Sequence, residues 1–189
     1  MDIALKKEII LSKAGCRLFG VIAGVIRIAL GAFVRIPLPF TPVPITLQTF
    51  FVLWAALALG GSLASATSLI YIGLGAAGAP IFAQAASGSA YWAGPTAGYL
   101  WGFVLAGFLA GRFIRYARGN FSLILAVVFS AEIVILLCGT LWLKFILGYP
   151  LMKLLWIGFF PFLPGDFLKA VAAAWLFQKT RGRLREIFS

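Results

Sequence analysis

Two ionisable residues of opposite charge stand three positions apart in an apolar stretch near the C-terminus. They are Asp166 and Lys169, in the segment PGDFLK at 164–169. Residues i and i+3 of a helix project from one face. The Pro-Gly pair places Asp166 at a helix start, where free N–H groups and the helix dipole stabilise a carboxylate. The pair could bind a ligand, Asp166 accepting from N–H donors and Lys169 meeting an anion; a structural ion pair with an N-cap is the alternative.

Three more polar side chains interrupt apolar stretches. Glu132 and Arg27 each lie near the middle of such a stretch, and Gln48 lies one turn inside another that Thr46 opens. Ionisable groups within a bilayer are costly and are functional hypotheses by default. Arg27 and Glu132 either satisfy each other or neighbouring backbone, or Glu132 couples a proton. Gln48 offers an uncharged donor and acceptor.

The residues that are missing exclude several classes of protein. The sequence contains no histidine, which removes the Ser–His and His-carboxylate sites of most hydrolases. It also contains no P-loop and no glycine-rich nucleotide motif. We therefore expect no enzyme activity, no cofactor and no metal site, and any ATP hydrolysis would belong to a partner.

The composition places these groups in a membrane protein. Of 189 residues, 62% are hydrophobic and 11% charged, with a mean hydropathy of +1.04, whereas soluble domains are about 45–50% apolar and about 25% charged. Because a spanning helix needs ~20 apolar residues, the chain accommodates six. The hydropathy predicts an all-α integral membrane protein, one polytopic domain over 1–189, with spans at about 14–34, 44–60, 62–77, 97–114, 120–143 and 159–178. A four-span alternative treats 44–77 as one re-entrant unit.

The basic residues predict the orientation of these spans. With the N-terminus inside, eleven of the 16 fall in cytoplasmic segments, namely Lys6, Lys7, Lys13, Arg17, Arg112, Arg115, Arg118, Lys179, Arg181, Arg183 and Arg185. Three fall outside, namely Arg35, Lys144 and Lys153. This positive-inside bias places both termini in the cytoplasm. The net charge of +11 is thereby explained by topology, and we expect no nucleic-acid partner.

The long connections all face outward in this arrangement. The segment 35–44 holds four prolines, which fix φ and lack an N–H donor, so it cannot be a helix. The segment 78–96 is uncharged and must be buried in protein or line a cavity. The third connection, 144–158, is amphipathic. The hairpin between spans two and three turns at Gly60-Gly61-Ser62. The outer loops are suited to closing over a ligand that arrives from outside the cell.

Three motifs resemble the BioY family, the biotin-specific substrate-capture (S) components of energy-coupling factor (ECF) transporters. They are PFTPVPITLQ at 39–48, GPTAGYL at 94–100 with Gly102-Phe103, and PGD at 164–166 with Lys169. Their order and spacing match over roughly residues 20–180. The resemblance implies six helices in an S-component-like bundle in a prokaryotic cell membrane, with both termini inside.

The resemblance also implies a biotin pocket near the outer face. By position, Asp166 would bind the ureido ring and Lys169 the valerate carboxylate. Phe40, Tyr91 and Trp92, from the outer loops, are expected to pack the apolar body of the ligand, and Gln48 is an expected polar contact.

Two segments depart from the family pattern. Many relatives carry Gly-Gly-Arg-Gly before Gly-Pro-Thr, whose arginine helps to hold the carboxylate, with an asparagine nearby. Here the segment AQAASGS at 83–89 offers Gln84 and Ser87 as neutral partners. In span one, S components tend to carry Ala-x-x-x-Ala, and the nearest equivalent is the ridge Cys16, Gly20, Gly24.

The resemblance implies that the chain captures biotin for uptake, with a transmembrane coupling protein (EcfT-type, or BioN) and ATPase subunits (EcfA-type, or BioM) as partners. The alternative is a stand-alone facilitator or an ion-coupled carrier for biotin or another small vitamin-like anion, to which Glu132 and Arg27 lend weight.

Overall fold

A computed structural model describes the chain from residue 2 to residue 188, with the side chains of 13–89 and 91–184. Lys6, Lys7 and Arg185, which were counted for orientation, lie outside the described side chains. Within these limits the protein is all-helical apart from one short ribbon. The helices are α1 (Asp2–Phe33), α2 (Gln48–Leu59), α3 (Gly61–Ala76), α4 (Ala97–Phe113), α5 (Phe121–Leu147), α6 (Leu151–Gly158) and α7 (Leu163–Phe188). The ribbon pairs β1 (Arg35–Ile36) with β2 (Ile45–Thr46), and short 3-10 turns are η1 (Ala83–Ala85), η2 (Ser89–Ala93) and η3 (Ile114–Ala117).

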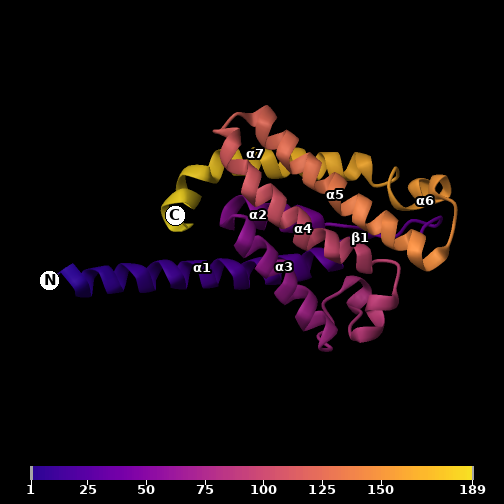
Figure 1. Cartoon of the computed structure of the whole chain (residues 1–189), viewed down its shortest axis with the longest axis horizontal. Helices are drawn as coiled ribbons and strands as arrows, with labels where there is room; N and C mark the ends of the chain where they lie inside the picture. Colours follow the sequence, from indigo (N-terminus) through magenta and orange to yellow (C-terminus); the bar gives the residue numbers. More distant parts are fainter. Residues whose placement is uncertain (1, 189) are drawn as a thin grey trace.

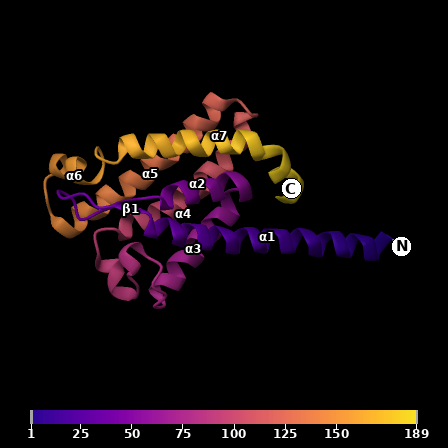
Figure 2. The ribbon, with the colours of Figure 1, turned by 180° about the vertical axis from the view of Figure 1, so that it is seen from behind.

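The helices form one bundle in which chain reversals gather at two ends (Figures 1 and 2). The chain termini, the α2–α3 turn and η3 lie toward one end. The β1–β2 ribbon, the segment 78–96 and α6 lie toward the other. These are the two groups of segments that the basic residues separate. We call them the predicted inner end and the predicted outer end.

Length and apolarity support membrane crossing for most of these helices. In the part of the chain that is described, three stretches could each cross a membrane alone, namely Lys13–Phe33, Ala97–Ala117 and Phe121–Leu147. The bent pair Leu151–Gly158 and Leu163–Leu184, with a 49° angle, could form a fourth crossing. The helices α2 and α3 are apolar but have only 12 and 16 residues. At 1.5 Å per residue they are about 18 and 24 Å long, shorter than the ~30 Å hydrocarbon core.

The hairpin of α2 and α3 nevertheless extends to the predicted inner end. It turns at Gly60, whose φ of +83° suits glycine. A Cβ on Gly61 would lie 2.6 Å from the carbonyl oxygen of Phe108 and 3.3 Å from the amide nitrogen of Arg112. The turn therefore packs on the last two turns of α4.

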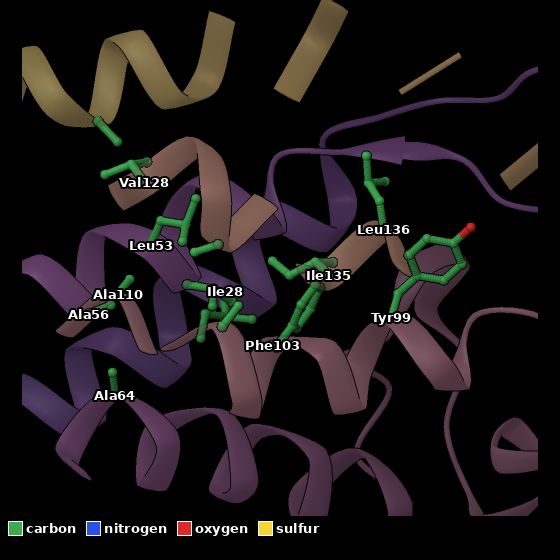
Figure 3. Packing of buried hydrophobic residues seen from close by; sticks show 14 of the residues in the cluster. Ile28, Leu53, Ala56, Ala64, Tyr99, Phe103, Ala110, Val128, Ile135 and Leu136 are labelled. Atoms are coloured by element: carbon green, nitrogen blue, oxygen red, sulfur yellow. The ribbon is translucent and has the colours of Figure 1, made fainter. Parts of the chain in front are cut away.

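A layer of aliphatic and aromatic side chains holds the helices together (Figure 3). Ile28 on α1 and Leu53 on α2 are fully buried, and Phe103 on α4 packs beside Ile135 on α5. Alanines such as Ala56 alternate with these larger residues. Small side chains let helix backbones approach closely in a membrane protein.

The outer connections agree in part with the prediction. The segment 35–44 is non-helical as expected, and its first two residues pair with the two residues that follow it, with Arg35 opposite Thr46. The segment 78–96 contains η1 and η2, and it is buried only in part: Phe82 and Ala83 are buried, whereas Gln84, Ala85 and Ser87 are exposed.

The boundaries near 144–158 were predicted wrongly. The helix α5 continues to Leu147 rather than ending at 143, and it stops at Gly148, whose φ is +63°. A further helix, α6, follows Pro150. Hydropathy misplaced this boundary because Lys144 lies on the exposed side of an uninterrupted helix. Charge on one face does not end a helix.

Candidate ligand-binding site

Asp166 and Lys169 form an ion pair at the predicted outer end. The Lys169 Nζ atom lies 2.8 Å from Asp166 Oδ1 and donates to the Thr49 hydroxyl at 3.1 Å. The pair is largely shielded, with 4% of the Asp166 side chain and 12% of the Lys169 side chain exposed. Because the surroundings exclude water, each buried charge is stabilised by the opposite charge and by any polar ligand that reaches it, rather than by solvent.

The position of Asp166 follows from the start of α7. The helix begins at Leu163, which puts Asp166 in its first turn. The dipole of the helix stabilises a carboxylate there. Lys169, one turn later, points back to the same face and toward the N-terminus of α2, where Thr49 lies. The helices α2 and α7 thus supply the polar side of the site.

A chain of hydrogen bonds ties this polar side to the segment 78–96. The Gln48 Nε2 atom donates to the Tyr71 hydroxyl at 2.6 Å, and Tyr71 donates to the Ile81 carbonyl at 3.0 Å. The Thr46 hydroxyl donates to Oε1 of the Gln48 side chain at 3.2 Å. Gln48 and Tyr71 are buried. Three separate segments are thereby held in register beside the ion pair.

These groups line a small cavity of about 50 Å³. Its walls come from β2 and the residues before it, α2, the segment 81–96, α4, α5 and α7. The residues are Val43, Pro44, Thr46, Gln48, Thr49, Ala83, Tyr91, Thr96, Tyr99, Leu100, Phe103, Ile135, Leu136, Phe162, Asp166 and Lys169. The cavity combines an ion pair and several uncharged polar groups with an apolar wall. Ligand sites for small molecules commonly have this mixture.

Four of the eight predicted site residues line this cavity, namely Asp166, Lys169, Gln48 and Tyr91. Tyr91 stacks on Phe82 with ring centroids 4.4 Å apart. Burial raises the pKa of its hydroxyl above the ordinary value, so Tyr91 presents an uncharged hydroxyl at physiological pH.

The other four predicted residues lie away from the cavity. Gln84 and Ser87 are exposed, and Gln84 has a φ of +69°. Trp92 packs against Trp101, with centroids 5.4 Å apart. Phe40 is 57% exposed in the connection between β1 and β2.

Of the alternatives for Arg27 and Glu132, mutual satisfaction is wrong. Arg27 is exposed on the surface of α1, whereas Glu132 on α5 is fully buried. Neither Glu132 oxygen has a hydrogen-bond partner within the described residues. Glu132 lies one turn after Phe129 on α5, and Phe129 packs against Phe167 of α7, the helix that carries the ion pair. Hydropathy placed both residues at mid-span but carried no information on which way each helix face turns.

Sequence reasoning missed Thr49, Thr96 and Tyr99 as cavity residues. The Tyr99 hydroxyl donates to the Gly158 carbonyl at 2.7 Å, which connects α4 to the end of α6. Figure 3 shows Tyr99 and Leu136 side by side on neighbouring helices. The sequence did contain a usable signal. Thr96 and Tyr99 lie within the GPTAGYL motif at the predicted outer end of a span, and Thr49 directly follows the predicted site residue Gln48.

Removal of one hydroxyl should loosen the segment 78–96. Tyr71→Phe keeps the ring but leaves the Gln48 amide and the Ile81 carbonyl unpaired in a buried place. An unpaired buried polar group costs about 1–3 kcal/mol. We expect faster amide hydrogen exchange in 78–89 and a lower melting temperature in detergent. Tyr149→Phe, at an exposed tyrosine, is the control; equal exchange in both variants and wild type would contradict the link.

A solved structure shares this fold. The chain superposes on the crystal structure of the S-component for biotin from an ECF-type ABC transporter with a TM-score of 0.84 and 25% sequence identity, covering 94% of this chain and 97% of that one. The fold is therefore that of an ECF S-component, a class of membrane-embedded transport subunit rather than an enzyme.

Sequence comparison identifies the family. The BioY family model matches residues 10–186, and the chain belongs to the BioY family. It is 40% identical over 150 residues to the biotin transporter BioY of Thermotoga maritima, covering 78% of this chain and 85% of that protein. It is 37% identical over 148 residues to the probable biotin transporter BioY of Pyrococcus horikoshii, covering 78% and 86%. The predicted resemblance is confirmed, and the chain is a multi-pass membrane protein of prokaryotic type.

Proposed function

We propose that this chain captures biotin at the outer face of a prokaryotic cell membrane, as the substrate-binding S-component of an ECF-type transporter. The observation that carries the proposal is the shielded Asp166–Lys169 pair, set beside an apolar wall in a BioY-family fold. We further propose that residues 1–189 act as one membrane domain with six spans and with both termini in the cytoplasm.

The chemistry of the cavity suits biotin. This ligand has a cyclic urea with two N–H donors, an apolar body and a carboxylate at the end of a flexible chain. In the proposal, the Asp166 carboxylate accepts from the ureido N–H groups, and the Lys169 ammonium binds the valerate carboxylate. Gln48 and Tyr91 supply uncharged polar contacts, and residues such as Phe103 and Phe162 contact the apolar body.

Binding requires the site to open. A cavity of about 50 Å³ holds only one or two waters, whereas pockets for small molecules are about 300–1,000 Å³. Asp166 and Lys169 are also in direct contact at 2.8 Å. To reach opposite ends of biotin they must separate, so ligand binding in this proposal exchanges an internal ion pair for two ligand contacts.

The outer segments are the parts whose movement would enlarge the site. Gln84, Ser87, Trp92 and Phe40 lie on the two connections that border the cavity, 35–47 and 78–96. In the proposal they join the site when those connections rearrange around the ligand. Gln84 and Ser87 then act as neutral partners of the carboxylate, in place of the arginine and asparagine of many relatives.

Transport would depend on partner proteins. In the proposal, the energy comes from ATPase subunits (EcfA-type, or BioM) through a transmembrane coupling protein (EcfT-type, or BioN), since the sequence itself has no nucleotide-binding motif. Part of the exposed surface of α1 is apolar, with Phe19, Ile22 and Ile26 half or more exposed, whereas the buried Gly24 faces Thr67 of α3 within the bundle. In the proposal this helix contacts the coupling protein.

One observation favours a second candidate function. Glu132 is fully buried without a hydrogen-bond partner in the described part of the chain, one turn from the contact of Phe129 with Phe167 on the helix that carries the ion pair. A buried carboxyl in such a place is a candidate proton site. An ion-coupled carrier or stand-alone facilitator for biotin, or for another small vitamin-like anion, would use it without ATPases.

Uptake by cells separates the two candidates. The chain is expressed in cells that lack biotin synthesis and uptake, with and without the coupling protein and ATPases of its source. We expect accumulation of labelled biotin only when the partners are present, and loss of accumulation with an ATPase that cannot hydrolyse ATP. Equal uptake without partners, abolished by a proton uncoupler or by Glu132→Gln, would instead support the carrier.

A further inference from the structure

An apolar groove crosses the predicted inner half of the molecule, at the opposite end from the ligand site. It lies between the second half of α4, η3 and the first half of α5, and has a volume of about 540 Å³. Its lining residues are Leu109, Ala110, Phe113, Tyr116, Ala117, Leu123, Ala126, Val127, Ser130, Ala131 and Val134. Neither the ligand site nor the proposed transport mechanism uses this groove.

The shape of the groove follows from residue size. Ala110, Ala117 and Ala131 are small and buried, and they form its floor. Phe113 and Tyr116 are large and at least half exposed, and they form a wall. Large residues beside small ones leave an open channel on the helix surface.

The length of the groove matches one membrane leaflet. Along α5 it runs from Leu123 to Val134, which at 1.5 Å per residue is about 16 Å. The hydrocarbon core of a bilayer is ~30 Å thick. The groove therefore covers about half of that thickness, beginning at the predicted inner end. An acyl chain of the inner leaflet has this length and this apolar character.

Three arginines lie in the segment at the predicted inner end of the groove. Arg112, Arg115 and Arg118 are exposed in the segment that joins α4 to α5, and residues 97–131 contain no Asp or Glu. The Arg115 Nη2 atom donates to the Tyr116 hydroxyl at 2.7 Å, and its guanidinium lies 4.7 Å from the centre of that ring. Because Tyr116 lines the groove, this contact places a cation at its edge.

We propose that this groove binds an anionic phospholipid of the inner leaflet, with an acyl chain along α5 and the phosphate against Arg112, Arg115 and Arg118. Basic sites next to spanning helices on the cytoplasmic side bind anionic headgroups in this way. The inference rests on the groove and its charges and is independent of the identity of the transported ligand.

Native mass spectrometry of the full chain, purified with phosphatidylglycerol and phosphatidylcholine of identical acyl chains, tests the headgroup assignment. One basic residue near an anionic surface contributes about fivefold in affinity. We expect wild type to retain phosphatidylglycerol over phosphatidylcholine by at least tenfold, and Arg112→Gln/Arg115→Gln/Arg118→Gln to lose that preference. Arg17→Gln/Lys179→Gln/Arg183→Gln makes the same change in charge at the same end and should keep it.

A second pair of variants tests the acyl-chain assignment. Ala126→Phe fills the groove and should reduce retention of both lipids at least fivefold, whereas Leu137→Phe, at an exposed α5 position outside the groove, should not. All four variants should elute as monodisperse protein with the melting temperature of wild type, which shows that they fold. Equal retention of the two lipids by wild type, equal losses in the two triple variants, or no effect of Ala126→Phe would overturn the proposal. The last result would leave the groove free for a helix of a partner subunit.

Discussion

Substitution of the buried ion pair is expected to weaken biotin binding at least tenfold. Asp166→Asn replaces a carboxylate, which can accept hydrogen bonds from both ureido N–H groups, with an uncharged amide that is a weaker acceptor. Lys169→Ala removes the cation. A hydrogen bond to a charged group contributes about 1.5–3 kcal/mol, and 1.4 kcal/mol corresponds to a factor of ten in the dissociation constant. Equilibrium binding of labelled biotin to the purified variants measures the effect.

The single variants are also expected to be less stable than wild type, and this effect must be distinguished from a loss of binding. Each leaves one charge of a shielded pair uncompensated, and breaking such a pair typically costs 3–5 kcal/mol of stability. Asp166→Asn/Lys169→Met removes both charges together, so it should fold better than either single variant while binding biotin no better. Lys153→Ala, at an exposed lysine of the predicted outer end, is the control for overall charge.

A neutral-tailed analogue assigns the role of Lys169. Biotin amide keeps the ureido ring and lacks the carboxylate. If Lys169 binds the carboxylate, Lys169→Ala should weaken biotin at least tenfold and leave biotin amide nearly unchanged. Equal losses for both compounds would place Lys169 at the ring, beside Asp166. Variants that bind biotin as tightly as wild type would refute the site assignment altogether.

The second large effect is expected at the contact between α4 and α5. Gly98 is buried against α5, and a Cβ there would overlap the Cβ of Trp142 and lie 2.7 Å from the carbonyl oxygen of Cys138. The obstacle is partly backbone, which cannot rotate away. Gly98→Ala should therefore reach the upper end of the ~1–3 kcal/mol that overpacking costs, and Gly98→Leu should leave little folded protein.

The same substitution elsewhere provides a matched comparison. Gly73 is an exposed glycine within α3, and a Cβ there meets no atom within 4 Å. Alanine favours the helix over glycine by about 1 kcal/mol, so Gly73→Ala should be neutral or stabilising. Melting temperatures in detergent compare the two. A Gly98→Ala protein as stable as the Gly73→Ala protein would contradict the close α4–α5 packing.

Much of the fold could be predicted from single residues and their spacing. The prolines of 35–44 excluded a helix, Gly60 indicated the hairpin, and the i,i+3 spacing of Asp166 and Lys169 put both on one face. These features depend on local backbone chemistry, which a sequence displays directly. The distribution of basic residues likewise separated the two ends of the bundle, because charge is excluded from the hydrocarbon core.

The remainder depends on contacts between distant segments. The bond from Gln48 to Tyr71 joins residues 23 positions apart, and that from Lys169 to Thr49 joins residues 120 apart. Nothing in the local sequence specifies such partners. The directions of Arg27 and Glu132 were missed for the same reason, since hydropathy gives the depth of a residue but not which neighbour its helix face meets.

The most direct test of the central claim is equilibrium binding of labelled biotin to the purified wild-type chain, with no partner subunit present. The account predicts saturable binding of one biotin per chain, displaced by unlabelled biotin and retained when an unrelated vitamin anion is added at the same concentration. A chain that remains monodisperse and folded, yet binds no biotin in a saturable way, would contradict it.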